Sequence, residues 1–370
     1  MSKKRKRSRK APDEATKLPR RGIFMMHEVP GNVAWQVPRP LTTDLVKRIA
    51  FNCFLCDVEL STAPDAPNGA TDEDVFARWL QRRFNVAGQH FPLNDGTERL
   101  YSDLLVPACR QCNNVYMSSI EDRIARAITG DFARFAQLRR EDLYLWCAKI
   151  YYGLIYHQTK LSDWRAGSVP FNPQLPQDRL HELDFLLRVL QGFRKRVMVG
   201  GPKKFFSLLT FPLSGSTQDF KPALTKEFPC IALQLGSVGV ICVLDDFGTT
   251  ENVYDEFYAT ALNGKVLDPM QFWELVARLS YLSWIMPFRF TYSCFEGQHD
   301  MMLEYSPESL GECAYDERIQ AQWIADLTGS PIDMIYVNGS ARSLLLRPDR
   351  SFNELTSEDD SPINQHPTQT

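Results

Sequence analysis

Two short cysteine motifs are the part of this chain whose residue types and spacing most clearly predict chemistry. Cys53 and Cys56 lie in the stretch NCFLCD, and Cys109 and Cys112 lie in PACRQCNN. Two residues between paired cysteines form a tight turn that directs both sulfur atoms toward one point. Two such turns supply the four thiolates of a structural tetrahedral Zn²⁺ site. We therefore predict that Cys53, Cys56, Cys109 and Cys112 bind one structural Zn²⁺.

Residues whose side-chain oxygen or nitrogen atoms could bind a metal ion lie between the two cysteine motifs and just after the second one. The stretch ATDEDVFARWL contains the acidic pair Glu73 and Asp74, and LYSDLLVPAC contains Asp103. Asn113 and Asn114 follow the last cysteine, at the expected start of a helix that buries an apolar face and ends at Gly130. An alternative interpretation of the acidic pair is a helix start, with the acids at the positive end of the helix dipole.

The order of these motifs over residues 50–128 resembles that of zinc-knuckle HNH endonucleases. The resemblance rests on CxxC, an acidic pair followed by VFARWL, then LLVPACRQCNN and SSIEDRI. It implies a ββα-metal core braced by the zinc of four cysteines, and a second, catalytic Mg²⁺ or Mn²⁺. The sequence departs from the family pattern where Asp74 replaces the base histidine, where Asp103 replaces the middle residue, and where Ala77 replaces a proline.

The resemblance also assigns roles to these residues. Glu73 falls on the acidic metal ligand and Asn113 or Asn114 on the third ligand position. Phosphodiester hydrolysis requires an activated water, a base and a cation on the phosphate. Glu73, Asp74 and Asp103 together with an asparagine amide would form an oxygen cage for a divalent ion. His90 is the nearest histidine that could serve as the base.

Charge is distributed unevenly along the chain, although the net charge is -3. Residues 1–22 carry ten Lys or Arg against two acids, whereas residues 351–370 carry no Lys or Arg. The basic arm is interpreted as a phosphate-binding arm or a nuclear-import-like signal, with a solubilising tail as the alternative. The arginines around these motifs favour nucleic acid as the binding partner, and DNA is the expected one. These arginines are Arg78, Arg82, Arg83, Arg110, Arg123 and Arg126.

Cysteine usage and hydropathy point to a reducing compartment. Nine cysteines form an odd number, and no apolar segment follows the basic N-terminus as a secretory signal would. No run approaches the roughly 18 apolar residues of a membrane span. We expect a cytoplasmic protein, with nucleoid association open. The remaining cysteines are predicted to be buried core residues: Cys147, Cys230, Cys242, Cys294 and Cys313.

The predicted fold class is α+β, with five segments. Residues 1–22 form a disordered basic arm, 45–130 an HNH-like zinc-knuckle domain, 131–199 a helical region, 200–350 a mixed α+β domain of unknown role, and 351–370 a disordered tail. Short apolar runs bounded by Gly, Pro and Asp predict strands after residue 200. A helix with Pro269 in its first turn follows these strands.

The function expected from these features is metal-dependent hydrolysis of DNA phosphodiester bonds by an HNH-type endonuclease. Bacterial or phage defence and mobile elements are the expected context. The first alternative is a catalytically degenerate HNH module that binds nucleic acid or a protein partner. The second is an unrelated zinc-stabilised interaction protein that functions through residues 200–350. Target specificity, nicking versus double-strand cleavage and oligomeric state stay open.

Overall fold

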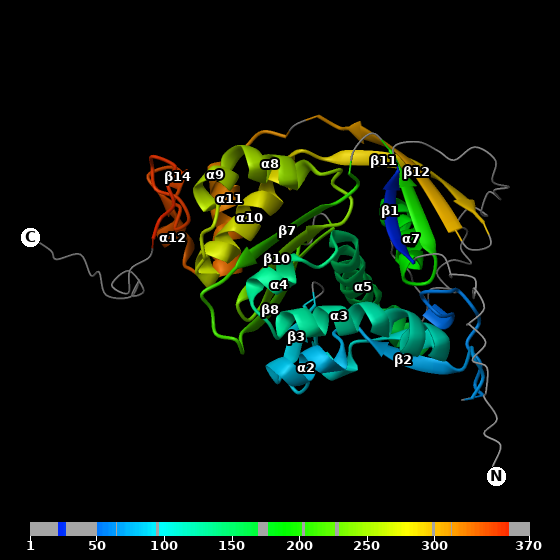
Figure 1. The fold of residues 1–370 in the computed structure, drawn as a ribbon. Coiled ribbons are helices and arrows are strands. Elements are labelled where there is room, and N and C mark those ends of the chain that lie inside the picture. Colours follow the sequence, from blue (N-terminus) through cyan, green and yellow to red (C-terminus); the bar gives the residue numbers. More distant parts are fainter. Residues whose placement is uncertain are drawn as a thin grey trace, which may run out of the picture.

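A computed structural model describes most of the chain between residues 21 and 354. The described residues are 21–26, 50–63, 65–93, 96–168, 177–201, 204–225, 229–297, 300–311 and 313–354. Residues 50–128, here called the cysteine module, lie at the bottom of the view in Figure 1. Two four-stranded sheets and a group of C-terminal helices lie above the module, and the long helix α5 runs between them.

The cysteine module is built on a two-stranded antiparallel sheet followed by a helix. Strand β2 (Ala70–Asp74) pairs with β5 (Leu105–Cys109), and Ala70 is opposite Cys109. The connection contains α2 (Arg78–Phe84), the hairpin of β3 (His90–Pro92) and β4 (Glu98–Leu100), and the 3-10 turn η1 (Tyr101–Asp103). After β5 the chain enters the π-helical turn η2 (Cys112–Met117), which continues into α3 (Ser118–Ile128).

The helix expected after Asn113 is confirmed, including its apolar face. Met117, Ile120, Ile124 and Ile128 are all buried. The helix start proposed for the acidic pair is wrong, because residues 70–74 form β2 and α2 begins after Ala77. Pairing with β5, which lies more than thirty residues further along the chain, overrides the local preference for a helix.

The helical region centres on α5 (Arg140–Gln158), whose side chains are buried on almost all sides. A helix with a single apolar stripe buries only one of its faces. Helix α5 is instead enclosed by the cysteine module, α7 and both large sheets. The neighbouring helices are α4 (Phe132–Ala136), α6 (Leu161–Arg165), α7 (Gln177–Leu190) and the 3-10 turn η3 (Gln191–Phe193). The Pro-rich stretch SVPFNPQLPQ, residues 168–177, has the composition of a linker or long loop, and it lies mostly outside the described residues.

Two four-stranded sheets follow, and one of them includes a strand from the N-terminus. The first has the order β1-β6-β12-β11, in which β1 and β12 both run parallel to β6. The second has the order β7-β10-β9-β8 and is antiparallel throughout. The strand bounds are β1 (Gly22–Met26), β6 (Arg196–Gly200), β7 (Ser207–Pro212), β8 (Phe220–Leu224), β9 (Cys230–Leu235), β10 (Val238–Val243), β11 (Phe288–Glu296) and β12 (Asp300–Ser309).

The C-terminal elements cover the second sheet. Helix α10 (Pro269–Ile285) begins with Pro269 in its first turn, as predicted, and Asp268 caps it. The stretch DMIYVNG, residues 333–339, is one of the apolar runs predicted as strands after residue 200. Its first three residues belong to the short helix α12, and a strand, β13, forms only at Tyr336–Val337. The remaining bounds are α8 (Thr249–Phe257), α9 (Ala259–Leu262), α11 (Glu317–Thr328), α12 (Ile332–Ile335), β13 (Tyr336–Val337) and β14 (Ser340–Ala341).

One hydrophobic core joins the cysteine module to the rest of the chain. It contains buried residues from Ile23 to Tyr305 and is continuous across the boundaries predicted at 130 and 200. Phe220 on β8 inserts among the module's aromatic rings, with ring centroids 5.2 Å from Phe84 and 5.8 Å from Phe76. The cysteine module therefore shares its interior with the sheets.

The two terminal segments expected to be disordered lie mainly outside the described residues. Where the described chain begins, Arg21 leads into β1. Where it ends, Gln271 donates a hydrogen bond to the carbonyl of Asn353 at 2.7 Å. The start of the segment 351–370 therefore contacts helix α10.

Candidate metal centre

The first cysteine pair lies in a tight turn that backbone hydrogen bonds define. The N–H of Cys53 donates to the carbonyl of Val58 at 3.0 Å, and the N–H of Asp57 donates to the carbonyl of Cys53 at 2.8 Å. Asp57 adopts a left-handed φ of 57°, and Asn52 donates to its carbonyl at 3.0 Å. Asparagine and aspartate tolerate and support such turns. The local sequence therefore brings the two sulfur atoms to one side of the loop.

The second pair lies where β5 passes into the helix. Cys109 is the last residue of β5 and Cys112 is the first residue of η2. The N–H of Cys112 donates to the sulfur of Cys109 at 3.5 Å. The N–H of Phe54 donates to the carbonyl of Pro107 at 3.0 Å, which fixes the first turn against the second.

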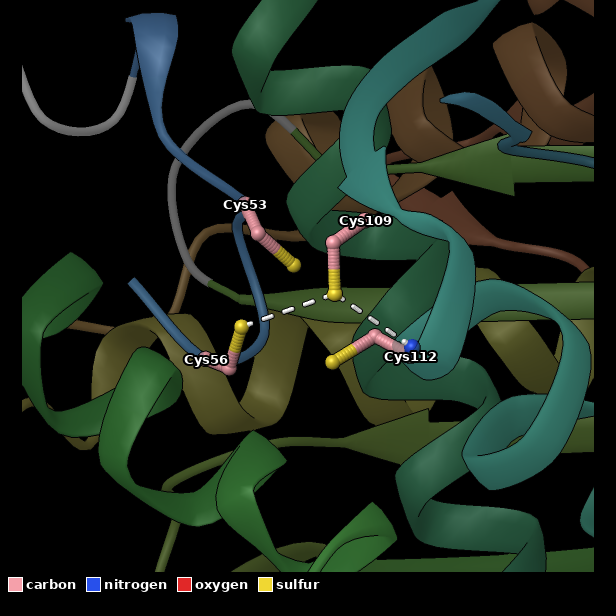
Figure 2. A group of neighbouring side chains, drawn as sticks. All are labelled: Cys53, Cys56, Cys109 and Cys112. Atoms are coloured by element: carbon pink, nitrogen blue, oxygen red, sulfur yellow. Dashed lines mark hydrogen bonds between the residues drawn. The ribbon is translucent and has the colours of Figure 1, made fainter. Parts of the chain in front are cut away.

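The four sulfur atoms converge on one point (Figure 2) and lie within 4.8 Å of one another. The Cys56 and Cys109 sulfurs are 3.7 Å apart. A tetrahedral zinc with bonds of about 2.3 Å to sulfur separates its ligands by about 3.8 Å. Hydrogen bonds from the Cys112 and Cys53 thiols lower the pKa of Cys56 to about 4, so the cluster carries negative charge at neutral pH. The four cysteines can therefore hold a metal ion such as zinc, as predicted.

A cavity of about 220 Å³ borders this centre. Cys53 and Cys56 form part of its wall, and Arg188, Arg194 and Lys195 lie on its other sides. Cys56 is the partly exposed member of the cluster, whereas the other three are buried. The side of the centre formed by the first turn is therefore its most exposed part.

Glu73, predicted to ligate a catalytic metal, is instead bound to a lysine. Its carboxylate is 5% exposed and forms an ion pair with the ammonium of Lys149, a fully buried residue of α5. The same ammonium lies 2.6 Å from the carboxylate of Glu121 on α3. One cation therefore contacts two carboxylates, of which Glu73 is buried and Glu121 is partly exposed.

Burial and charge act in opposite directions on this group. Burial raises the pKa of Glu73 to about 7, although the charge of Lys149 opposes that rise. Burial alone would lower the pKa of Lys149, but the carboxylates of Glu121 and Glu73 raise it above its usual value. Lys149 therefore stays protonated at neutral pH and acts as a permanent internal cation.

A glycine allows α5 to approach close enough for this contact. A Cβ atom at Gly153 would lie 2.4 Å from a methyl group of Val75, so a larger residue does not fit. Gly153 is one helical turn after Lys149, and Val75 directly follows β2. The close approach at Gly153 therefore positions Lys149 beside the end of β2.

The other candidate catalytic residues make separate contacts. Asp74 accepts hydrogen bonds from Arg78 at 3.0 Å and from Gln81 at 3.3 Å. Asp103 is exposed and accepts from the hydroxyl of its neighbour Ser102 at 3.2 Å. His90 is exposed on β3.

Asn113 serves as a brace between two elements. Its side-chain amide donates to the hydroxyl of Thr71 at 3.3 Å and to the carbonyl of Asp72 at 3.2 Å. These contacts join η2 to β2, beside the metal centre. The neighbouring Asn114 is exposed, and its carbonyl accepts a hydrogen bond from Ser118 at 2.9 Å.

In the part of the chain that the structure describes, the four cysteines are the one group of three or more His, Cys, Asp or Glu side chains placed to hold a metal ion. The expected oxygen cage of Glu73, Asp74 and Asp103 is not assembled there. Of the remaining cysteines, four are buried as predicted, whereas Cys313 is exposed, which corrects the prediction for that residue.

Sequence reasoning did not identify Lys149 as part of this site. The residue lies in LYLWCAKIYYGLIYH, where a single charge interrupts a helix of apolar and aromatic residues. A lysine in such a run is almost never fully buried without a partner. That mismatch was the available signal, but its partners are 76 and 28 residues away along the chain.

Comparisons with family models, with curated proteins and with solved structures find no match for this chain. Within the described residues, no helix has both the length and the apolar character needed to cross a membrane.

Proposed function

We propose that this chain is a catalytically inactive HNH-like module that binds nucleic acid, with DNA as the expected ligand, and does not cleave it. The observation that carries this proposal is the position of Lys149 between Glu73 and Glu121. An HNH-type reaction would need a divalent cation at Glu73. Here a protonated lysine already neutralises that carboxylate, and the surrounding core excludes water.

The arrangement of the cysteine module supports the HNH-like part of the proposal. Two antiparallel strands, β2 and β5, are followed by the helix of η2 and α3, and two of the four cysteines lie where β5 passes into η2. Glu73 lies on the first of these strands, where it pairs with Lys149. Binding does not require the second metal, because the ββα unit is held by the cysteine cluster.

Arginine usage supports nucleic acid as the partner. Between residues 78 and 140 there are ten arginines and no lysine. Arginine binds phosphate through two parallel N–H donors, and such contacts position a nucleic acid without reading its bases. Arg82, Arg110 and Arg126 are exposed.

The test separates binding from cleavage. Purified protein is incubated with supercoiled plasmid and with labelled single-stranded DNA in Mg²⁺, in Mn²⁺ and in EDTA, and binding is measured by fluorescence anisotropy across a salt series. We expect salt-sensitive binding without cleavage in any metal. Metal-dependent cleavage that Glu73→Ala abolishes would overturn the proposal and support the metal-dependent nuclease, which otherwise stays a prediction. Absence of both binding and cleavage would overturn it as well.

A further inference from the structure

Two aromatic rings on the surface each lie beneath two arginine side chains. Over the ring of Tyr116, the guanidinium carbon of Arg21 lies 4.4 Å from the centroid and that of Arg194 lies 5.7 Å from it. Over the ring of Phe24, Arg139 and Arg196 are both 5.4 Å from the centroid. We call these six residues the arginine–aromatic face: Arg21, Phe24, Tyr116, Arg139, Arg194 and Arg196.

The fold assembles this face from four segments that are distant in sequence. Parallel pairing of β1 with β6 places Gly22 opposite Arg196, and the N–H of Gly22 donates to the carbonyl of Lys195 at 3.3 Å. Tyr116 comes from η2, directly after the metal centre, and Arg139 immediately precedes α5. Gly22 also lies beside Arg139, since a Cβ built at Gly22 would be in ordinary van der Waals contact, at 3.6 Å, with both terminal nitrogens of Arg139.

The face concentrates positive charge. Because Arg21 and Arg194 cover the same ring, their charges lie no more than about 10 Å apart, close to the Debye length at physiological salt. The ion pair that the face forms within the described residues is a long contact of 3.7 Å between Arg139 and Glu141. Stacking on a ring holds a guanidinium in place without neutralising it. The face therefore favours an anionic partner.

The cation–π contacts of this face are compatible with phosphate binding. A guanidinium over a ring still carries N–H donors that match two oxygens of one phosphate. Arg21 and Arg196 are exposed, and Arg139 is 46% exposed, so their edges are accessible. Arg194 is held by a hydrogen bond of 3.2 Å to Gln191.

The sequence extends the same charge beyond the face. Arg21 is the last of ten basic residues that begin at Lys3, and the face starts where that basic run ends. We infer that the arginine–aromatic face is the surface that binds the phosphate backbone of a nucleic acid without sequence preference. This inference rests on the proposed function and names its binding surface, which does not include Glu73 or Asp74.

The test compares two triple variants with the same change in charge. Arg21→Gln/Arg139→Gln/Arg196→Gln removes charge from the face, whereas Arg318→Gln/Arg347→Gln/Arg350→Gln removes it from exposed arginines of the C-terminal part. Both are titrated by anisotropy against labelled oligonucleotides of about 20 nucleotides, single-stranded and duplex, of two unrelated sequences, over a salt series that spans about fourfold. Metal content and thermal melting verify that both variants fold.

We expect the face variant to lose at least about tenfold in affinity at low salt, equally for both sequences. Its salt slope on duplex should fall by about 2 to 3, because each lost phosphate contact removes about 0.9. The control variant should stay within about twofold of wild type, since its arginines make no such contacts. Equal losses in the two variants, or no loss in the face variant, would overturn this inference and leave the proposed function standing.

Two further outcomes are informative. Wild-type protein that binds no oligonucleotide at all would overturn the proposed function and this inference together. Binding to vesicles of phosphatidylserine, lost in the face variant, without binding to oligonucleotides would assign the face to a membrane surface and overturn the inference.

Discussion

Replacing Lys149 by methionine tests whether the buried lysine is the cation of the Glu73 site. Methionine fills a similar volume but carries no charge, so the change leaves the carboxylate of Glu73 buried without its partner. Glu73 is 5% exposed, and Lys149 is fully buried between Glu73 and Glu121. Removing one partner of a buried ion pair costs about 3–5 kcal/mol, because the other charge stays desolvated.

The size of this loss depends on pH, and the direction follows from the pKa of Glu73. In the folded chain that pKa is raised from 4.5 to about 7 by burial. The folded state therefore binds the proton more tightly than the unfolded state, so the contribution of Glu73 to stability falls as pH rises from about 4.5 to about 7. Without Lys149, the pKa of Glu73 rises further, and the fall continues above pH 7.

The measurement is urea unfolding of wild type and Lys149→Met at pH 5 and at pH 8. At pH 8 we expect the variant to be destabilised by about 3–5 kcal/mol. At pH 5 we expect a much smaller difference, because Glu73 is then protonated and needs no cation. The double variant Glu73→Gln/Lys149→Met should recover at least half of the loss at pH 8, since it buries two neutral side chains of matching size.

Two results would refute this reasoning. Equal destabilisation at pH 5 and pH 8 would show that the loss comes from packing and not from the unpaired carboxylate. A double variant no more stable than Lys149→Met at pH 8 would show that Glu73 does not interact with Lys149 in the way the structure indicates.

Further predictions concern the cation site, the metal centre and the helix contact. In Lys149→Ala, Mn²⁺ should raise the melting temperature because the ion can bind between the carboxylates of Glu73 and Glu121, whereas the melting temperature of wild type should not change. Equal shifts in both proteins would contradict the assignment of Lys149 as the cation of this site. Cys53→Ser should contain no bound zinc by metal analysis and should melt at a lower temperature, and wild type in a strong chelator should behave in the same way. The control Cys313→Ser, at an exposed cysteine, should retain its zinc and its melting temperature. Full zinc content in Cys53→Ser would contradict the assignment. Gly153→Ala should lose about 1–3 kcal/mol in urea unfolding because its Cβ meets a valine methyl at 2.4 Å, whereas Gly88→Ala, with open space around it, should be near neutral; equal stabilities would contradict the close contact.

The metal centre was predictable from sequence because its geometry is mostly local. Each cysteine pair is a turn of four residues, so residue spacing alone predicts where the sulfurs point. The same applies to the helix after Cys112, whose buried side chains recur with helical spacing. Residue spacing does not predict that the two turns face each other. Four cysteines in two pairs nevertheless made this the simplest arrangement.

The Glu73 site was not predictable in the same way, because distant contacts decide it. Residues 70–74 have the composition of a helix start, yet β5 pairs with them and makes them a strand. The partner of Glu73 is 76 residues away, on a helix that Gly153 brings close to β2. A motif can therefore suggest that Glu73 ligates a metal, but the partner that reaches Glu73 is decided by packing of the whole core.

Under the proposed function, nucleic-acid binding does not depend on a cation at Glu73, because the Glu73 site and the arginine–aromatic face use different elements. The Glu73 site lies between β2, α3 and α5, where the ammonium of Lys149 contacts the carboxylates of Glu73 and Glu121. The arginine–aromatic face uses β1, η2, the residue before α5 and the start of β6. The face meets the metal centre at η2, which contains Cys112, the brace Asn113 and the ring of Tyr116. The cysteine cluster fixes the start of η2, so we expect the bound metal to order the arginine–aromatic face. Zinc removal should then weaken nucleic-acid binding, whereas Lys149→Met at pH 5 should leave binding unchanged.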